Sequence, residues 1–202
     1  MKYPDFFNTV EPIQLQDPLS HFLGAFEEGQ LEISYLDCVK LAGHSCPTVA
    51  GAYLMAKKGL EALYGHTLPQ RGAIHVSMRA AEAEGVTGVI CNVISFIAGA
   101  NGIGGFKGIG GHFSRNNLVH YDTPMAGEVT LTRRDTKERV IVSYDASIVP
   151  GDPAMKLLMG KSLQGLASKE EQKAFGQLWQ ARVEKILLST ELWDQMITIK
   201  KG

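Results

Sequence analysis

The chain has 202 residues, of which 45% are hydrophobic and 20% charged, enough apolar material for one folded domain with a real core. Its formal net charge of −1 removes the general electrostatic case for nucleic-acid binding, because such a surface is strongly basic. No apolar stretch is long enough to span a bilayer, and the first residues lack the positive cluster and apolar core of a signal peptide. We therefore expect a cytoplasmic protein that binds neither nucleic acid nor membrane.

The first third of the chain predicts helices. Asp17 followed by proline is typical of a helix start, because aspartate caps free amides and proline loses nothing at the first helical position. Ser34 and Asp37 resemble a capping box at the start of a second helix. A third has an apolar face, with small residues that would let another helix approach closely. The helices are expected over 17–26, 34–43 and 46–64.

The middle of the chain changes its period. Residues 74–78 alternate between apolar and polar, which indicates a half-buried strand. Residues 86–98 fit either a buried strand or a buried helix, and their length between Gly85 and Gly99 favours a helix. Three further strand-like runs follow at 117–121, 128–133 and 139–144, and a turn at 135–137 makes a hairpin of the last two.

After a Pro-Gly-Asp-Pro break at 150–153, the sequence predicts helices again, at 153–165 and from Ser168 onward. Ser168 and Glu171 form a second capping box. The sum is an α+β fold with an antiparallel sheet flanked by helices and a helical C-terminal extension. We expect residues 1–150 to form the core domain and residues 151–202 to pack on that core or on a partner protomer.

The best candidate for a working site is the sequence Gly-His-Ser-Cys-Pro at 43–47, between two expected helices. The free amides and the dipole at a helix start favour the thiolate of Cys46. His44 is close enough to share a metal ion or a proton with that sulfur. Imidazole and thiolate suit zinc, with iron, cobalt or nickel as alternatives, rather than calcium or magnesium. Two ligands are an incomplete shell, and the candidates to complete it are Cys91, His112, His21 or a residue of a second protomer.

A glycine-rich segment, Gly99–Gly111, is the second candidate feature. Its backbone amides could face an anion, with Lys107 and Arg115 adding positive charge. If the segment folds over the site, it would be a lid, with Lys107 acting catalytically as an electrophile or anion clamp beside His44 and Cys46. A turning connection that needs glycine is the alternative. The expected ligand-binding residues are Ser45, Thr48, Gly105, Lys107 and Gly108.

The sequence Leu-Asp-Cys-Val-Lys-Leu-Ala-Gly-His-Ser-Cys-Pro at 36–47, followed by Gly-Ala-Tyr at 51–53, resembles the opening of the FmdE family, which is named after a component of formylmethanofuran dehydrogenase. The likeness covers roughly residues 34–145 and is most specific at Gly-His-x-Cys-Pro. It implies an α+β core, an intertwined homodimer, and a metal ion at His44 and Cys46. There are two departures. The family's Thr-Gly-Cys turn is replaced by Ser95–Ile97, with Cys91 one helical turn earlier, and the C-terminal zinc finger of many members is absent, since no cysteine follows Asp152.

Three hypotheses follow. In the first, the chain is an enzyme or enzyme-like metal protein with an open coordination position under the glycine-rich segment, and its reaction is hydrolytic or redox. In the second, it is a non-catalytic metal carrier, a sensor, or an accessory component of a larger oxidoreductase. In the third, His44 and Cys46 are structural and function resides in a partner interface, because cysteine is often a small buried hydrophobe and histidine can cap helix carbonyls.

Overall fold

The computed structural model describes residues 1–202 and confirms the α+β class. The chain forms seven α-helices, a two-stranded sheet and a five-stranded sheet. The helices are α1 (Pro18–Phe22), α2 (Tyr35–Ala42), α3 (Pro47–Tyr64), α4 (Thr87–Ala98), α5 (Ala154–Leu163), α6 (Lys169–Leu188) and α7 (Trp193–Met196). The strands are β1 (Ile13–Gln16), β2 (Gln30–Ile33), β3 (Ile74–Met78), β4 (Val119–His120), β5 (Val129–Arg133), β6 (Arg139–Tyr144) and β7 (Ile197–Lys201).

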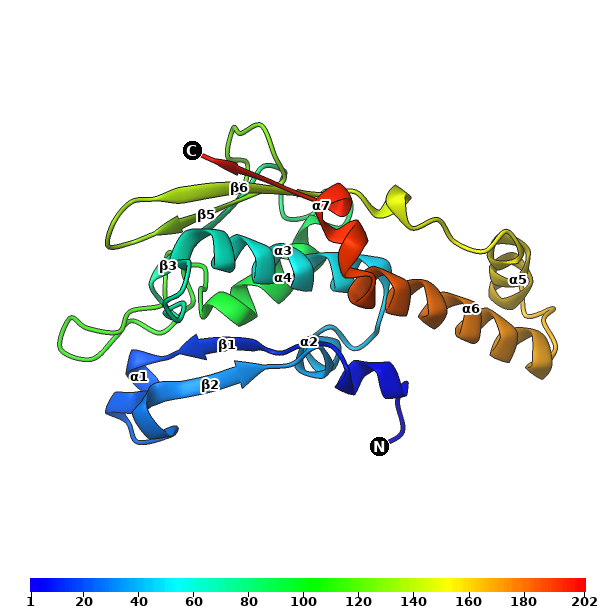
Figure 1. Ribbon diagram of the computed structural model, residues 1–202, viewed down its shortest axis with the longest axis horizontal. Coiled ribbons are helices and arrows are strands. Elements are labelled where there is room, and N and C mark those ends of the chain that lie inside the picture. The colour runs from blue at the N-terminus through cyan, green and yellow to red at the C-terminus, as the bar shows by residue number, and fades with distance from the viewer.

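The molecule is layered around α3. The five-stranded sheet, in the order β4-β3-β5-β6-β7, is antiparallel except for the parallel pair β3–β4. Figure 1 shows α3 and α4 between this sheet and the β1–β2 hairpin. Helix α3 is therefore covered on most sides, and 13 of its 18 residues are buried. The small residues of α3 were predicted to allow close approach by another helix, and they also allow close approach by a strand. The ring of Tyr144, in β6, lies directly over Gly51.

The helical predictions for 34–43 and 46–64 are confirmed, as are the two capping boxes and the helical alternative for 86–98. The strand at 74–78 and the 135–137 turn between β5 and β6 are confirmed as well. The strand expected at 117–121 shortens to two residues.

The prediction for 17–26 is wrong in length. Asp17 does cap α1, accepting hydrogen bonds from the amides of Leu19 and Ser20, but the helix ends at Phe22. The chain must turn back here because β2 pairs antiparallel with β1, a hairpin that the sequence did not predict. Each of these strands has only one β-branched residue, since β1 reads Ile-Gln-Leu-Gln and β2 reads Gln-Leu-Glu-Ile, so the local strand signal is weak.

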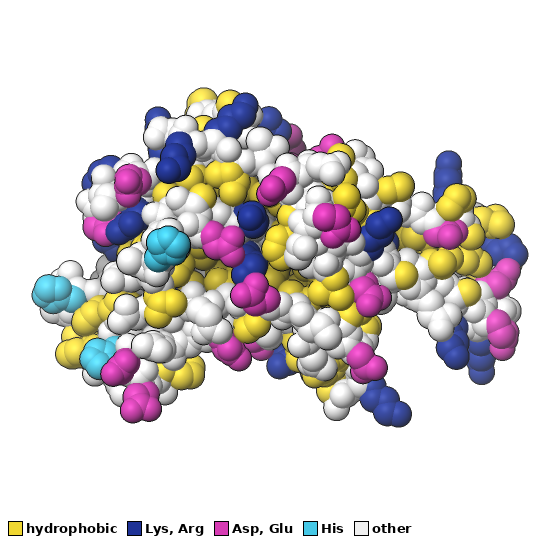
Figure 2. All heavy atoms as spheres, viewed as in Figure 1, with side chains coloured by type: hydrophobic (Ala, Val, Ile, Leu, Met, Phe, Trp, Pro, Cys, Tyr) yellow, Lys and Arg dark blue, Asp and Glu magenta, His cyan; other side chains and the backbone are white.

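The last quarter of the chain is helical as predicted, but it ends in an unpredicted strand. Helices α5 and α6 pack on each other and form an arm that projects from the core in Figure 1, whereas the other end of α6 packs on α3. Strand β7 then pairs with β6. Apolar side chains gather on the projecting end in Figure 2, where Leu157, Leu163 and Leu166 are exposed. No helix is long and apolar enough to cross a membrane.

Candidate functional site

The candidate site lies in the tight connection between α2 and α3. Gly43 ends α2 with a left-handed backbone (φ 75°), a conformation that glycine adopts without steric cost. Cys46 is the N-cap of α3, and Pro47 occupies the first helical position. The predicted arrangement of helix, glycine and capping cysteine is therefore present in the structure.

His44 and Cys46 face each other across this connection. His44 Nε2 lies 3.3 Å from Cys46 Sγ, and His44 Nδ1 lies 3.0 Å from the carbonyl oxygen of Ala42. With its proton on Nδ1, the ring donates to Ala42 and turns the Nε2 lone pair toward the sulfur. Cys46 Sγ accepts a hydrogen bond of 3.4 Å from the Val49 amide at the start of α3. The thiol is buried and the imidazole is exposed, so the pair is reached from the His44 side.

Ser45, between the two residues, is held by side chains from distant parts of the chain. Its hydroxyl donates to Gln180 Oε1 at 2.9 Å, so the Tyr35 hydroxyl, 3.0 Å away, donates to it in turn. Its carbonyl accepts hydrogen bonds from Trp179 Nε1 at 3.0 Å and Gln180 Nε2 at 3.3 Å. These contacts of Ser45 with Tyr35, Trp179 and Gln180, which we call the Ser45 clamp, were not predicted from the sequence. The signal that could have found them is the N–H of Trp179, because a tryptophan N–H usually finds a partner when buried.

The structure does not bring the other expected ligands to this pair. Cys91 is buried in α4, where its sulfur lies 3.5 Å from Ser95 Oγ and burial raises the pKa of its thiol. His112 is exposed just after the glycine-rich segment, with its ring beside that of Phe113. No three His, Cys, Asp or Glu side chains of the chain gather closely enough to hold a metal ion. An ion at this pair would therefore take any further ligand from a source other than a His, Cys, Asp or Glu side chain of the same chain.

A cavity of about 370 Å³ adjoins His44. Its size is in the range of small-molecule sites, and six of its ten lining residues are apolar. The polar lining side chains other than the imidazole are Asn92 and Ser95 of α4 and Asn101. The complete lining is Leu41, Ala42, His44, Val89, Asn92, Val93, Ser95, Phe96, Ala100 and Asn101.

The glycine-rich segment reaches this cavity only at its start, through Ala100 and Asn101. Lys107 is exposed and does not line the cavity, and neither do Gly105 and Gly108. The chain continues from this segment toward α1, where Phe113 packs against Phe22 with ring centroids 5.2 Å apart. Thr48, in the first turn of α3, is half-buried outside the cavity lining.

Comparison of the chain with models of known protein families and with curated proteins found no match.

Proposed function

We propose that the chain is a metal-binding protein in which His44 and Cys46 hold a zinc ion, with iron, cobalt or nickel as alternatives. One observation carries the proposal: the 3.3 Å approach of His44 Nε2 to Cys46 Sγ with Nδ1 against the Ala42 carbonyl. A metal-binding histidine typically donates its second ring N–H to a carbonyl or carboxylate, which fixes the ring and the tautomer.

The donor set fits the ion. With Zn–N near 2.05 Å and Zn–S near 2.3 Å, two ligands of one tetrahedral zinc lie about 3.5 Å apart. The observed separation of 3.3 Å requires little rearrangement. The Val49 amide and the positive end of the α3 dipole both favour a negatively charged sulfur, which is the form that binds metal.

Two protein ligands leave room for water or a small molecule, and the adjoining cavity gives that molecule a place. Its apolar walls would exclude water from the bound molecule, and Asn92, Ser95 and Asn101 would orient polar groups toward His44. A bound ion would supply Lewis-acid chemistry at this position. We therefore favour an enzyme acting on a small polar molecule, hydrolytic or redox, over a purely structural role for the pair.

A metal carrier, a sensor or an accessory component of a larger oxidoreductase is the second candidate function. The exposure of His44 favours it, because an ion held by an exposed imidazole can be passed to another protein. Ligand binding separates the two candidates: an enzyme's cavity takes a small molecule when the metal is present, whereas a carrier exchanges its ion rapidly with a chelator.

The remaining parts of the proposal rest on the resemblance and on surface features. The motif's local geometry supports membership of the FmdE family, because Gly43 ends one helix and Cys46 caps the next. The exposed leucines of α5 and of the connection from α5 to α6 support a homodimer, whose second protomer could complete the ligand set. Three unpaired cysteines support a cytoplasmic location.

The test is metal content per chain, measured by elemental analysis on protein purified without an affinity tag. His44→Ala and Cys46→Ser should each lose a near-stoichiometric transition metal that the wild type retains. His66→Ala and Cys38→Ala are the matched controls, since they remove an exposed imidazole and a buried thiol that make no hydrogen bond to His44 or Cys46. Titration with Co²⁺ adds a second readout, because a thiolate ligand gives a charge-transfer band that Cys46→Ser abolishes. A wild type that stays free of metal after reconstitution refutes the proposal.

A further inference from the structure

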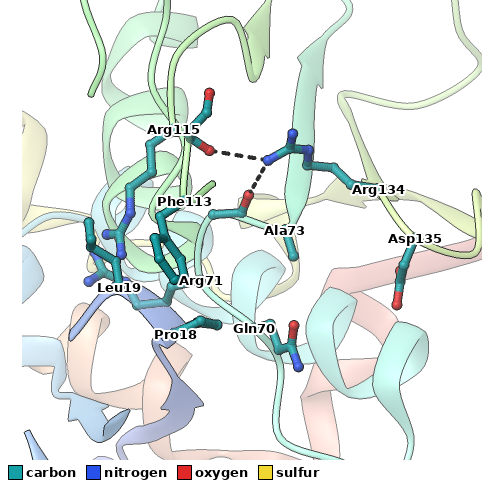
Figure 3. A pocket seen from close by; sticks show the side chains of 11 residues that line it. Pro18, Leu19, Gln70, Arg71, Ala73, Phe113, Arg115, Arg134 and Asp135 are labelled. Carbon is teal, nitrogen blue, oxygen red and sulfur yellow. Dashed lines mark hydrogen bonds between the residues drawn. The ribbon is translucent and has the colours of Figure 1, made fainter. Parts of the chain in front are cut away.

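A second cavity, of about 200 Å³, lies beside α1 and is lined by three arginines. Figure 3 shows Arg71 and Arg115 on one side of Phe113, with Arg134 and Asp135 on the other. The walls also include the apolar side chains of α1's first residues. This arginine cavity is distinct from the His44 cavity, with which it shares no lining residue.

Asp17, which is not part of the lining, holds two of the three arginines in place. Its side chain is only 3% exposed and accepts hydrogen bonds from both Arg71 and Arg115. It also accepts hydrogen bonds from the amides of Leu19 and Ser20. Burial alone would raise the pKa of Asp17, but the hydrogen bonds and positive charges around it hold that pKa below its ordinary value. One carboxylate thus faces two guanidinium groups, and a positive charge remains uncompensated.

The two guanidinium groups differ in what they still offer. Each of the three nitrogens of Arg71 has a protein acceptor, since Nε and Nη2 donate to the carbonyls of Ile97 and Phe96 and Nη1 donates to Asp17. Arg115 has a single protein acceptor, Asp17, so its Nε and Nη1 keep free N–H groups. Among the fully buried side-chain polar atoms, only Ser20 Oγ lacks a hydrogen-bond partner. The unpaired nitrogens of Arg115 are therefore not fully buried, and they reach solvent.

Arg134 adds a second set of free donors. Its Nη1 donates to the carbonyls of Gly72 and Ser114, at 2.9 and 3.1 Å, which fixes the side chain at the cavity, while Nε and Nη2 have no protein acceptor. Asp135 does not offset this charge, because Arg133, which does not line the cavity, already donates to both of its oxygens. The cavity is therefore positive and rich in unpaired N–H donors.

Gly72 makes room for this arrangement. A side chain there would meet Arg115 Cγ at 3.3 Å and Nε at 3.5 Å, so glycine lets the arginine lie flat against the backbone beside the cavity. The sequence had suggested an anion near the glycine-rich segment, with Lys107 and Arg115 as its cations. Arg115 does line this cavity, whereas Lys107 does not.

We propose that this cavity binds a small oxyanion, a carboxylate or a phosphate, through the free N–H groups of Arg115 and Arg134. Planar guanidinium groups present paired donors that match the oxygens of both anions. A volume of about 200 Å³ equals roughly six or seven waters at ~30 Å³ each, which suits a small organic acid or phosphate. Phe113 and Leu19 would contact the apolar part of such a molecule.

The test is calorimetric titration of the wild-type protein with inorganic phosphate and with butyrate, at ionic strength held constant with chloride. We expect saturable binding of at least one of them. Arg134→Gln and Arg115→Lys should each weaken it by roughly 10- to 100-fold, the effect of losing charge-assisted hydrogen bonds. Arg115→Lys keeps the positive charge beside Asp17 but removes the planar guanidinium group and its paired N–H donors. Arg79→Gln is the matched control, since Arg79 is exposed and lies outside the cavity.

Each outcome decides the proposal. Phosphate binding alone or butyrate binding alone supports it and identifies the anion class. Absence of saturable binding by both probes overturns it, as does undiminished binding in Arg134→Gln, or an equal loss in Arg79→Gln, which would mean general charge attraction. Circular dichroism checks that each variant folds, and if Arg115→Lys does not, Arg134→Gln decides, because its side chain is exposed.

Discussion

Asp17→Asn is the sharpest test of the arginine cluster. The asparagine keeps an oxygen that can cap α1, but it removes the negative charge between Arg71 and Arg115. Breaking a buried ion pair by removing one partner costs about 3–5 kcal/mol, because the remaining charges stay buried without compensation. At about 2–4 °C per kcal/mol for a chain of this length, the melting temperature should fall by roughly 6–20 °C. Asp135→Asn is the control: its side chain is 58% exposed, and a surface pair contributes about 0–1 kcal/mol.

The pH dependence of that difference identifies its cause. A carboxyl group whose pKa is lowered by folding contributes stability above its unfolded pKa and loses it as the pH falls through the folded pKa. The pKa of Asp17 lies below its ordinary value of 3.8, so the difference between wild type and Asp17→Asn should be complete at neutral pH and shrink below about pH 4. Urea unfolding followed by circular dichroism measures it. A difference under ~1 kcal/mol at neutral pH, or one that stays constant down to the lowest pH at which the protein folds, refutes the reasoning.

Three further substitutions test the packing and the clamp. Gly51→Ala would place a methyl group inside the ring of Tyr144, so we expect a loss of about 1–3 kcal/mol or more in urea unfolding, and an unchanged midpoint would contradict the packing. Gly176→Ala on α6 meets no atom within 4 Å and should raise stability by up to ~1 kcal/mol in the same assay; a destabilised variant would show that α6 packs differently. Trp179→Phe removes the hydrogen bond to the Ser45 carbonyl and should lower zinc affinity by roughly 10-fold in a dye-competition titration, whereas unchanged affinity would show that the clamp does not position the ligands.

The elements that the sequence predicted are those with local signals. Ser34 with Asp37 and Ser168 with Glu171 specify helix starts within four residues, and the alternation at 74–78 specifies a strand by itself. The elements it missed depend on partners far along the chain. Strand β7 forms because Ile197 and its neighbours pair with β6, and its own local signal, the β-branched alternation Ile-Thr-Ile at 197–199, is too short to predict a strand by itself.

The proposed sites also differ in whether local sequence could predict them. The approach of His44 to Cys46 follows from a glycine C-cap directly before the histidine and a cysteine N-cap two residues after it, so it could be predicted locally. The arginine cavity could not, because Asp17 and Arg115 are 98 positions apart and meet only when the end of the glycine-rich segment lies against α1. The prediction of Lys107 as a clamp remains untested, although Lys107 lies outside the lining of the cavity that the segment was expected to close.

The clamp on Ser45 gives the C-terminal helices a place in the proposed metal chemistry. Trp179 and Gln180 hold the one residue between the two ligands, so loosening α6 from α3 would disturb the separation of His44 and Cys46. Thermodynamic linkage makes this coupling reciprocal: if docking of α6 tightens metal binding, a bound ion must strengthen the docking of α6 by the same free energy. Amide hydrogen exchange in α6 should therefore slow when zinc is added to the wild type, and it should not change in Cys46→Ser. If exchange in α6 does not slow even when the wild type has bound zinc, the Ser45 clamp and the metal site are not coupled.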